Sequence, residues 1–157
     1  MLRLQKLMVG NALLVILAAM LAGFMLGFGL IGGLELLPGQ IVEMPYYGTA
    51  EGWARAHTGG VTNGLLVLAV ALCLPKLNLS ARMQKWSAYG FIYVAWSFTV
   101  FYWLGNASSN RALTMGKSAL GEPDLIGLIG FLPGLPSVLI VVVLLFVAAK
   151  GVFARPS

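Results

Sequence analysis

Long apolar runs dominate the sequence, and short polar segments separate them. A bilayer has a hydrocarbon core of about 30 Å, which a helix of about 20 apolar residues can cross. Four runs qualify, at residues 8–34, 58–75, 86–105 and 125–149. The first is too long for a signal-peptide core and is not followed by an Ala-x-Ala site, so we expect it to stay in the protein. The pattern predicts an all-α integral membrane protein, a single four-helix bundle over residues 1–157.

Composition excludes a water-soluble globular domain. Hydrophobic residues make up 59% of the chain and charged residues only 10%, whereas soluble domains average about 25% charged residues. The net charge of +5 is spread over short segments, without the clustered basic face that a nucleic-acid binder uses, so no nucleic-acid partner is expected. The single cysteine, Cys73, allows neither an intramolecular disulfide nor a cysteine metal cluster.

Basic residues predict the orientation in the membrane. Seven of the ten Lys and Arg residues lie at the N-terminus, in the 75–86 loop and at the C-terminus. The other two loops, 35–57 and 106–124, hold the remaining three and all five acids. By the positive-inside rule, both termini are expected in the cytoplasm. Most polar side chains then lie in the outer loops, and we expect any site on that side.

The only histidine, His57, falls where the first outer loop becomes the second predicted helix. Gly60 and Gly64 follow at spacings of three and four, so the three residues form one stripe with a smooth groove below the imidazole. One histidine does not hold a bare metal ion, but it suits haem, because the porphyrin supplies four nitrogens and the protein one axial ligand. Two plainer interpretations stay open: the glycines are a helix contact, and the histidine is an interfacial residue with a hydrogen-bond partner.

A polar strip runs along the outer end of the third predicted helix. Tyr102 shares a face with Thr99 and Asn106, at the membrane level of His57 and Asn63. A phenol and a carboxamide that converge on one cavity can hold and polarise a small oxygen-bearing substrate. Other aromatic residues near the helix ends are typical of an aromatic belt, namely Trp86, Tyr89 and Trp103.

Sequence motifs of soluble enzymes are absent: there is no nucleophile elbow, Walker loop, dinucleotide fingerprint or His-Glu-x-x-His. The apolar runs also lack paired acids, which disfavours a proton-coupled transporter. Arg55 and Arg111 are expected at the outer surface, where they could meet haem propionates or, more simply, lipid headgroups.

Several of these residues together resemble a known family, the styrene oxide isomerases, which are small four-helix enzymes of bacterial membranes. The resemblance rests on Glu-Gly-Trp-Ala-Arg-Ala-His at residues 51–57, on Asn63-Gly64, on Phe101-Tyr102 and on Asn110-Arg111. It implies a homotrimer in the bacterial cytoplasmic membrane that binds ferric haem b between subunits. It also implies conversion of a small apolar aryl epoxide to an aldehyde, by Lewis-acid ring opening and a 1,2-hydride shift.

The same resemblance assigns roles to individual residues. His57 would be the axial iron ligand, and Asn63 and Tyr102 would match the polar residues beside the open iron face. Styrene-type members carry an aspartate two helical turns before the tyrosine, where this chain has Val94. We therefore expect the preferred epoxide to differ.

Two alternatives remain from the sequence. A haem electron carrier needs a second axial ligand, which would be Met44 or Met115 on the outer side. In a haem-free assembly or transport subunit, His57 and Asn63 would only form hydrogen bonds between helices.

Overall fold

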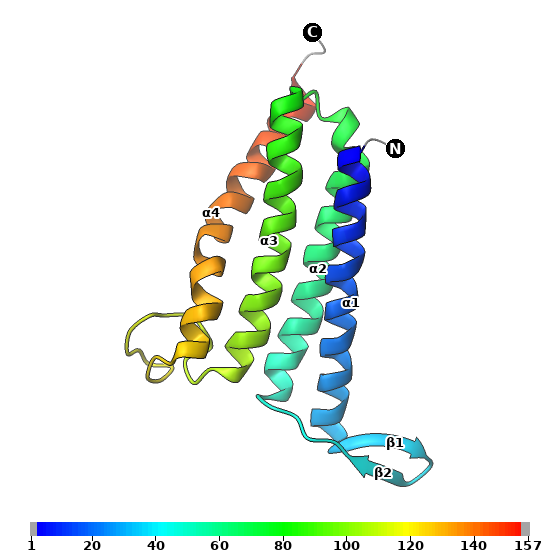
Figure 1. Ribbon diagram of the computed structural model, residues 1–157, viewed down its shortest axis with the longest axis vertical. Helices are drawn as coiled ribbons and strands as arrows, with labels where there is room; N and C mark the ends of the chain where they lie inside the picture. The colour runs from blue at the N-terminus through cyan, green and yellow to red at the C-terminus, as the bar shows by residue number, and fades with distance from the viewer. Residues whose placement is uncertain (1–2, 155–157) are drawn as a thin grey trace.

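The computed structural model describes residues 3–154. Four long helices carry the fold: α1 (Arg3–Ile31), α2 (Ala50–Cys73), α3 (Ala81–Ala107) and α4 (Leu125–Phe153). A short 3₁₀ turn, η1 (Leu74–Lys76), follows α2, and a hairpin of β1 (Gly33–Leu37) and β2 (Gln40–Glu43) lies between α1 and α2 (Figure 1). The four predicted helices are confirmed, and each is longer than the sequence pattern suggested.

Three helical stretches of the described chain are long and apolar enough to cross a membrane: Arg3–Ile31, Ala50–Lys76 and Leu125–Phe153. The fourth crossing, by α3, stays a prediction. Helix α1 begins and α4 ends at one end of the molecule, opposite the hairpin and the α3–α4 loop (Figure 1). This arrangement agrees with an even number of crossings, while the placement of the termini in the cytoplasm stays a prediction.

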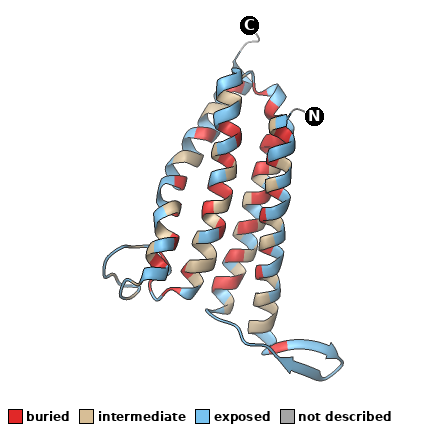
Figure 2. Cartoon of the chain, in the orientation of Figure 1, coloured by how far each residue is buried: buried red, intermediate tan, exposed pale blue. Residues whose placement is uncertain are grey.

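The helices pack as two antiparallel pairs. The main contacts join α1 to α2 and α3 to α4, and the two pairs meet mainly through α2 and α3, with fewer contacts between α1 and α3. Helix α4 packs mainly on α3 and lies at one edge, so the arrangement is more open than the four-helix bundle expected (Figure 1). Much of the outer surface of α1 and α4 is exposed in the single chain (Figure 2). Many of these exposed residues are apolar, among them Phe24, Leu139 and Phe146. Such faces are suited to lipid or to other copies of the chain.

A β-hairpin replaces the end of the first predicted helix. Gly32 has a φ of +77° and ends α1, and its N–H donates to the carbonyl of Phe28 at 2.9 Å. The strands pair in antiparallel fashion across Pro38-Gly39, where Gly39 has a φ of +80°. The prediction of helix to residue 34 is therefore wrong for its last three residues, and the all-α class omits this hairpin. The missed signal is a Pro-Gly pair between two short apolar runs.

Helix α2 begins eight residues earlier than predicted, because Thr49 caps its first turn and is itself hydrogen-bonded to α3. The contacts between Thr49 and Asn106 are called the clamp below. The Thr49 hydroxyl accepts a hydrogen bond from the N–H of Gly52 at 3.0 Å. Asn106 of α3 accepts from the Thr49 N–H at 2.9 Å and donates to the Thr49 carbonyl at 3.3 Å. Trp53 is fully buried, and its indole N–H donates to the carbonyl of Tyr47 at 2.7 Å. Residues 51–57 are consequently helical, and His57 lies about two turns inside α2 rather than at its mouth.

Candidate functional site

The imidazole of His57 lies against the backbone of α1. Its Nδ1 is 2.9 Å from the carbonyl oxygen of Ala19. A carbonyl oxygen only accepts hydrogen bonds, so Nδ1 carries the proton and Nε2 of the neutral ring keeps a free lone pair. A Cβ at Gly23 would lie 2.8 Å from Nδ1, so a glycine there leaves room for the ring. Metal-binding histidines are typically oriented in this way, with the second ring nitrogen donating to a carbonyl.

His57 opens onto a hollow of about 510 Å³ on the outside of the α1–α2 pair. The other residues that line it come from α1, and they are Met20, Gly23, Phe24 and Leu26. No local motif in the sequence marks these residues as part of a site, because the rotation of α1 relative to His57 is set by packing. Met44 and Met115, the expected second ligands of an electron carrier, do not line this hollow, whereas Met20 does.

The groove expected along Gly60 and Gly64 is filled by α1. A Cβ at Gly60 would lie 2.7 Å from the Cβ of Ala19. A Cβ at Gly64 would overlap the side chain of Ile16. Both glycines are buried, so in one chain they serve close helix packing, the plainer alternative. The expectation of an open surface below the imidazole is wrong.

Tyr102 and Asn63 face the seam between α2 and α3. The Tyr102 ring lies on α2 at Gly59, where a Cβ would be 2.5 Å from Cε2, and it stacks on Phe98 with ring centroids 6.1 Å apart. Asn63 follows Gly59 by one helical turn and therefore lies on the same face of α2. Its Nδ2 is buried and has no hydrogen-bond partner among the described residues. A buried donor without a partner is rare in folded proteins, which makes Asn63 a candidate for contact with a ligand.

One chain does not bring His57, Asn63 and Tyr102 into a single cavity. Successive helical residues are rotated by about 100°, so Gly59 and Asn63 lie about 200° and 240° around α2 from His57. His57 and Tyr102 accordingly line different hollows. Within a single chain, His57 therefore lies apart from Asn63 and Tyr102.

The polar strip expected beside Tyr102 is reduced to Tyr102 itself. The Thr99 hydroxyl donates to the Ala95 carbonyl at 2.9 Å, within α3. Asn106 is engaged in the clamp on Thr49. The side chains of Thr99 and Asn106 therefore serve the fold. The Tyr102 hydroxyl forms no hydrogen bond with the described residues.

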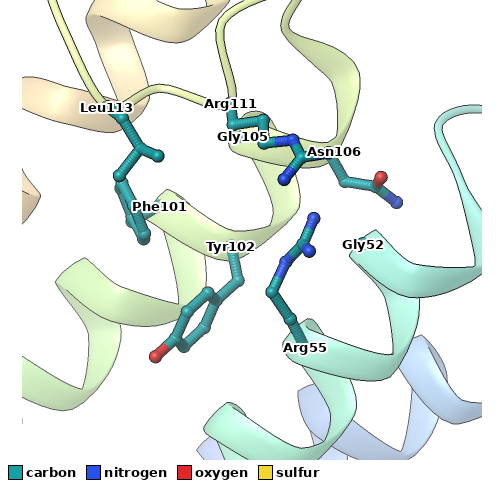
Figure 3. A pocket seen from close by; sticks show the side chains of 8 residues that line it. All are labelled: Gly52, Arg55, Phe101, Tyr102, Gly105, Asn106, Arg111 and Leu113. Atoms are coloured by element: carbon teal, nitrogen blue, oxygen red, sulfur yellow. The ribbon is translucent and has the colours of Figure 1, made fainter. Parts of the chain in front are cut away.

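A second hollow, of about 170 Å³, lies at the outer end of the seam between α2 and α3. Arg55 of α2 and Arg111 of the α3–α4 loop both point into it, above the ring of Tyr102 (Figure 3). The remaining lining residues are Gly52, Phe101, Gly105, Asn106 and Leu113. Neither guanidinium forms an ion pair or a hydrogen bond with a described residue. Among the described residues, an ion pair joins Lys117 to Glu122 at 2.6 Å. The sequence predicts that both arginines lie at the outer surface, but it does not predict that they line the same hollow.

Arg111 is held in place by an unusual backbone. Arg111 and Ala112 have φ values of +59° and +54°, which are costly for residues with a side chain. Asn110, fully buried, stabilises this turn: its Oδ1 accepts from the Ala112 N–H at 3.1 Å, and its Nδ2 donates to the Thr114 carbonyl at 2.8 Å.

The other end of the α3–α4 loop is fixed by Asp124, the N-cap of α4. Its carboxylate accepts from the N–H groups of Gly127 and Ser109, at 2.6 and 2.8 Å, and from the hydroxyls of Ser108 and Ser109. These hydrogen bonds, the two from the backbone first, lower the pKa of Asp124 from 3.8 to about 2.

Comparison with known proteins identifies a family for the chain. The sequence matches the family described as styrene oxide isomerase over residues 4–153. It is similar to a styrene-oxide isomerase of Pseudomonas fluorescens, with 36% identity over 129 residues, which are 82% of this chain and 76% of the relative. A match over nearly the whole length, with the helices that carry His57 and Tyr102 inside it, shows that this chain belongs to the styrene oxide isomerase family.

Proposed function

We propose that this isomerase converts a small apolar aryl epoxide to the corresponding aldehyde in a bacterial cytoplasmic membrane, with ferric haem b on His57. The observation that carries the proposal is the hydrogen bond from His57 Nδ1 to the Ala19 carbonyl, which leaves Nε2 as a ligand above an apolar hollow. Family membership supplies the class of reaction.

The residues present fit a haem. The described residues contain no group of three His, Cys, Asp or Glu side chains that could hold a metal ion by themselves, whereas haem iron needs a single protein ligand. Met20, Phe24 and Leu26 give the hollow beside His57 an apolar wall. Gly60 and Gly64 act in this proposal by holding α1 against α2, which fixes Ala19 opposite His57.

When bound, haem would supply a Lewis acid for the epoxide oxygen. The chain's part is to orient the epoxide and to stabilise charge as the ring opens. The Tyr102 hydroxyl and the Asn63 amide, both without partners among the described residues, are donors suited to the oxygen. The benzylic C–O bond breaks, a hydride moves from the neighbouring carbon to the benzylic carbon, and the neighbouring carbon becomes the aldehyde. No electron or proton is gained or lost overall.

Water must be kept from the cation-like centre, because capture by water would give a diol. The apolar exterior of α1 and α4 supports a reaction within the membrane, where water is scarce and apolar epoxides concentrate. A membrane location therefore favours both uptake of the substrate and the rearrangement.

The active unit in this proposal is an oligomer, a trimer by family resemblance. His57 faces one side of α2, and Asn63 and Tyr102 face the other. A second copy that sets its α2–α3 seam against the His57 hollow brings the three side chains to one ligand. The exposed apolar faces of the single chain provide surface for such contacts.

An absorption spectrum of the purified protein, with aldehyde formation from styrene oxide measured on the same sample, tests the proposal. A Soret band with a high-spin ferric spectrum and aldehyde production are expected. A low-spin His/Met spectrum would indicate the electron carrier instead. The lack of a Soret band after expression with ample haem would favour the haem-free assembly or transport subunit.

A further inference from the structure

One end of the molecule carries cations and no acidic side chain of the described chain. Helices α1 and α3 begin at this end, and α2 and α4 end there (Figure 1). The described Lys and Arg residues at this end, called the basic end below, are Arg3, Lys6, Lys76, Arg82, Lys85 and Lys150. All five acids of the sequence lie in the segments 35–57 and 106–124, at the opposite end. A counter-anion for these cations therefore comes from outside the described chain.

Two of these cations line a hollow of about 490 Å³ on the first turns of α3. Its lining residues are Arg82, Lys85, Trp86 and Tyr89, at spacings that place side chains on one face of a helix. All four are exposed in the single chain, Trp86 by 63%. Neither Arg82 nor Lys85 forms an ion pair or a hydrogen bond with a described residue. Two uncompensated cations and a large exposed ring thus share one surface.

The order of these side chains along α3 matches the layers of a membrane surface. Arg82 precedes Trp86 by four residues, and Lys85 precedes Tyr89 by four, so each cation lies about 6 Å closer to the basic end than its aromatic neighbour. Lys and Arg near the ends of membrane helices extend their charges to the headgroups, and Trp and Tyr lie at the boundary with the acyl chains. A ligand that contacts both kinds of side chain has an anionic head and an apolar body.

Helix α3 has less apolar surface to hold it in a membrane than the other helices. The described stretches that are long and apolar enough to cross a membrane belong to α1, to α2 with η1 and to α4. Helix α3 is not among them, and it buries the polar side chains of Ser87, Ser97 and Thr99. Contacts between its first turns and lipid headgroups therefore contribute more to its depth in the membrane than such contacts do for the other helices.

We infer that the face of α3 formed by Arg82, Lys85 and Trp86 binds an anionic phospholipid. The Arg82 guanidinium donates two parallel hydrogen bonds to the lipid phosphate, and Lys85 adds a second positive charge beside it. The Trp86 ring lies against the first part of the acyl chains. This site is at the opposite end of α3 from Tyr102, and the inference is independent of the cofactor and reaction proposed above.

Quenching of tryptophan fluorescence by brominated lipids tests the inference, because bromine on an acyl chain quenches only rings close to it. The full chain is placed in phosphatidylcholine nanodiscs that contain equal fractions of brominated phosphatidylglycerol or brominated phosphatidylcholine, at about 0.15 M ionic strength. The chain has four tryptophans, so the signal of Trp86 is the part of the quenching that Trp86→Phe removes. We expect this signal to report an approximately tenfold preference for phosphatidylglycerol, since each cation near the membrane surface strengthens binding of an anionic lipid several-fold.

Two double variants with the same change in net charge separate a site from general attraction. Arg82→Gln/Lys85→Gln is expected to abolish the preference for phosphatidylglycerol. Lys76→Gln/Lys150→Gln removes two cations from the same end but outside the hollow, and it is expected to keep the preference. Circular dichroism checks the fold of each variant. If the first double variant does not fold, the single substitutions Arg82→Gln and Lys85→Gln are each expected to reduce the preference part of the way.

Several results would overturn the inference. Equal quenching of Trp86 by the two lipids in the wild type means that the face does not select charge. A preference that folded Arg82→Gln/Lys85→Gln keeps, or that both double variants lose equally, means that these two side chains form no site. Lack of quenching by either lipid means that another protein surface, such as a second copy of the chain, covers the face. An excess of soluble glycerol phosphate is expected not to displace the brominated lipid, and displacement would show that the apolar body is not recognised.

Discussion

The imidazole Nδ1 of His57 lies 2.9 Å from the backbone carbonyl oxygen of Ala19, so the neighbouring helix determines which ring nitrogen is free. The acceptor is a main-chain atom inside α1, and no side-chain substitution at position 19 removes it. Gly23, one turn further along α1, leaves the space that this contact needs. The orientation of the candidate iron ligand is thus a property of how α1 packs on α2.

His57→Ala should abolish haem retention and leave a folded membrane oligomer. Alanine creates no clash beside Gly23, and the sequence contains no other histidine to replace the ligand. The ratio of Soret to protein absorbance and size-exclusion chromatography measure the two properties. A variant with full haem content and an unchanged spectrum would show that the ligand lies elsewhere.

Tyr102→Phe should keep haem but lower epoxide turnover about 10²- to 10³-fold, the usual effect of removing one donor to a developing negative charge. The change removes only a hydroxyl that has no partner among the described residues, so the ring packing on Gly59 and Phe98 is kept. Tyr89→Phe, on an exposed position of the same helix, is the matched control and should leave the rate unchanged. Equal rates for Tyr102→Phe and the wild type would place Tyr102 with the aromatic belt.

Asn63→Leu should raise the melting temperature and lower turnover. The Asn63 amide nitrogen is a buried donor without a partner in the described chain, and burial of such a group costs about 1–3 kcal/mol. An apolar side chain of similar size removes this cost but cannot orient an epoxide. Thermal unfolding in detergent and aldehyde formation test the two effects, and a loss of stability would mean that Asn63 has an important structural partner.

Val94→Asp should shift the preference among epoxides toward styrene oxide. Val94 is only 2% exposed, and it occupies the position where styrene-type relatives are expected to carry an aspartate that stabilises the cation during ring opening. Val94→Asn is the control, since it has nearly the same shape without the charge. We would measure aldehyde formation from styrene oxide and from a bulkier apolar epoxide; equal effects of Asp and Asn would contradict a role for charge.

Acid should destabilise the outer loop through Asp124. Its pKa is about 2 in the folded protein, below its ordinary 3.8, so its hydrogen bonds stabilise the fold fully above about pH 4. This stabilisation is lost as the pH falls toward about 2. Melting temperatures of the wild type and Asp124→Asn, measured from pH 6 to pH 2.5, are expected to converge at low pH. A constant difference across this range would show that ionisation of Asp124 does not contribute.

The sequence predicts the helices well because a membrane requires long uninterrupted apolar runs, and such runs are visible without any tertiary information. The sequence pattern predicts too late a start for α2, because the polar string at 51–57 resembles a loop, whereas the hydrogen bonds of Thr49 with Gly52 and Asn106 hold it in a helix. Residue type and resemblance point to His57, Asn63 and Tyr102 as candidates. Their distribution over two sides of α2 depends on how α1 and α3 rotate against it, which the pattern of one helix does not reveal.

The clamp between Asn106 and Thr49 also separates two parts of the molecule mechanically. On one side lies the hairpin, with its exposed Pro38-Gly39 tip, and on the other lies the helix that carries His57. Because the chain is anchored at Thr49, a longer or altered hairpin has no direct means of pulling α2 out of position. The tip is therefore a natural place to insert an epitope or a fluorophore, which would report on membrane sidedness.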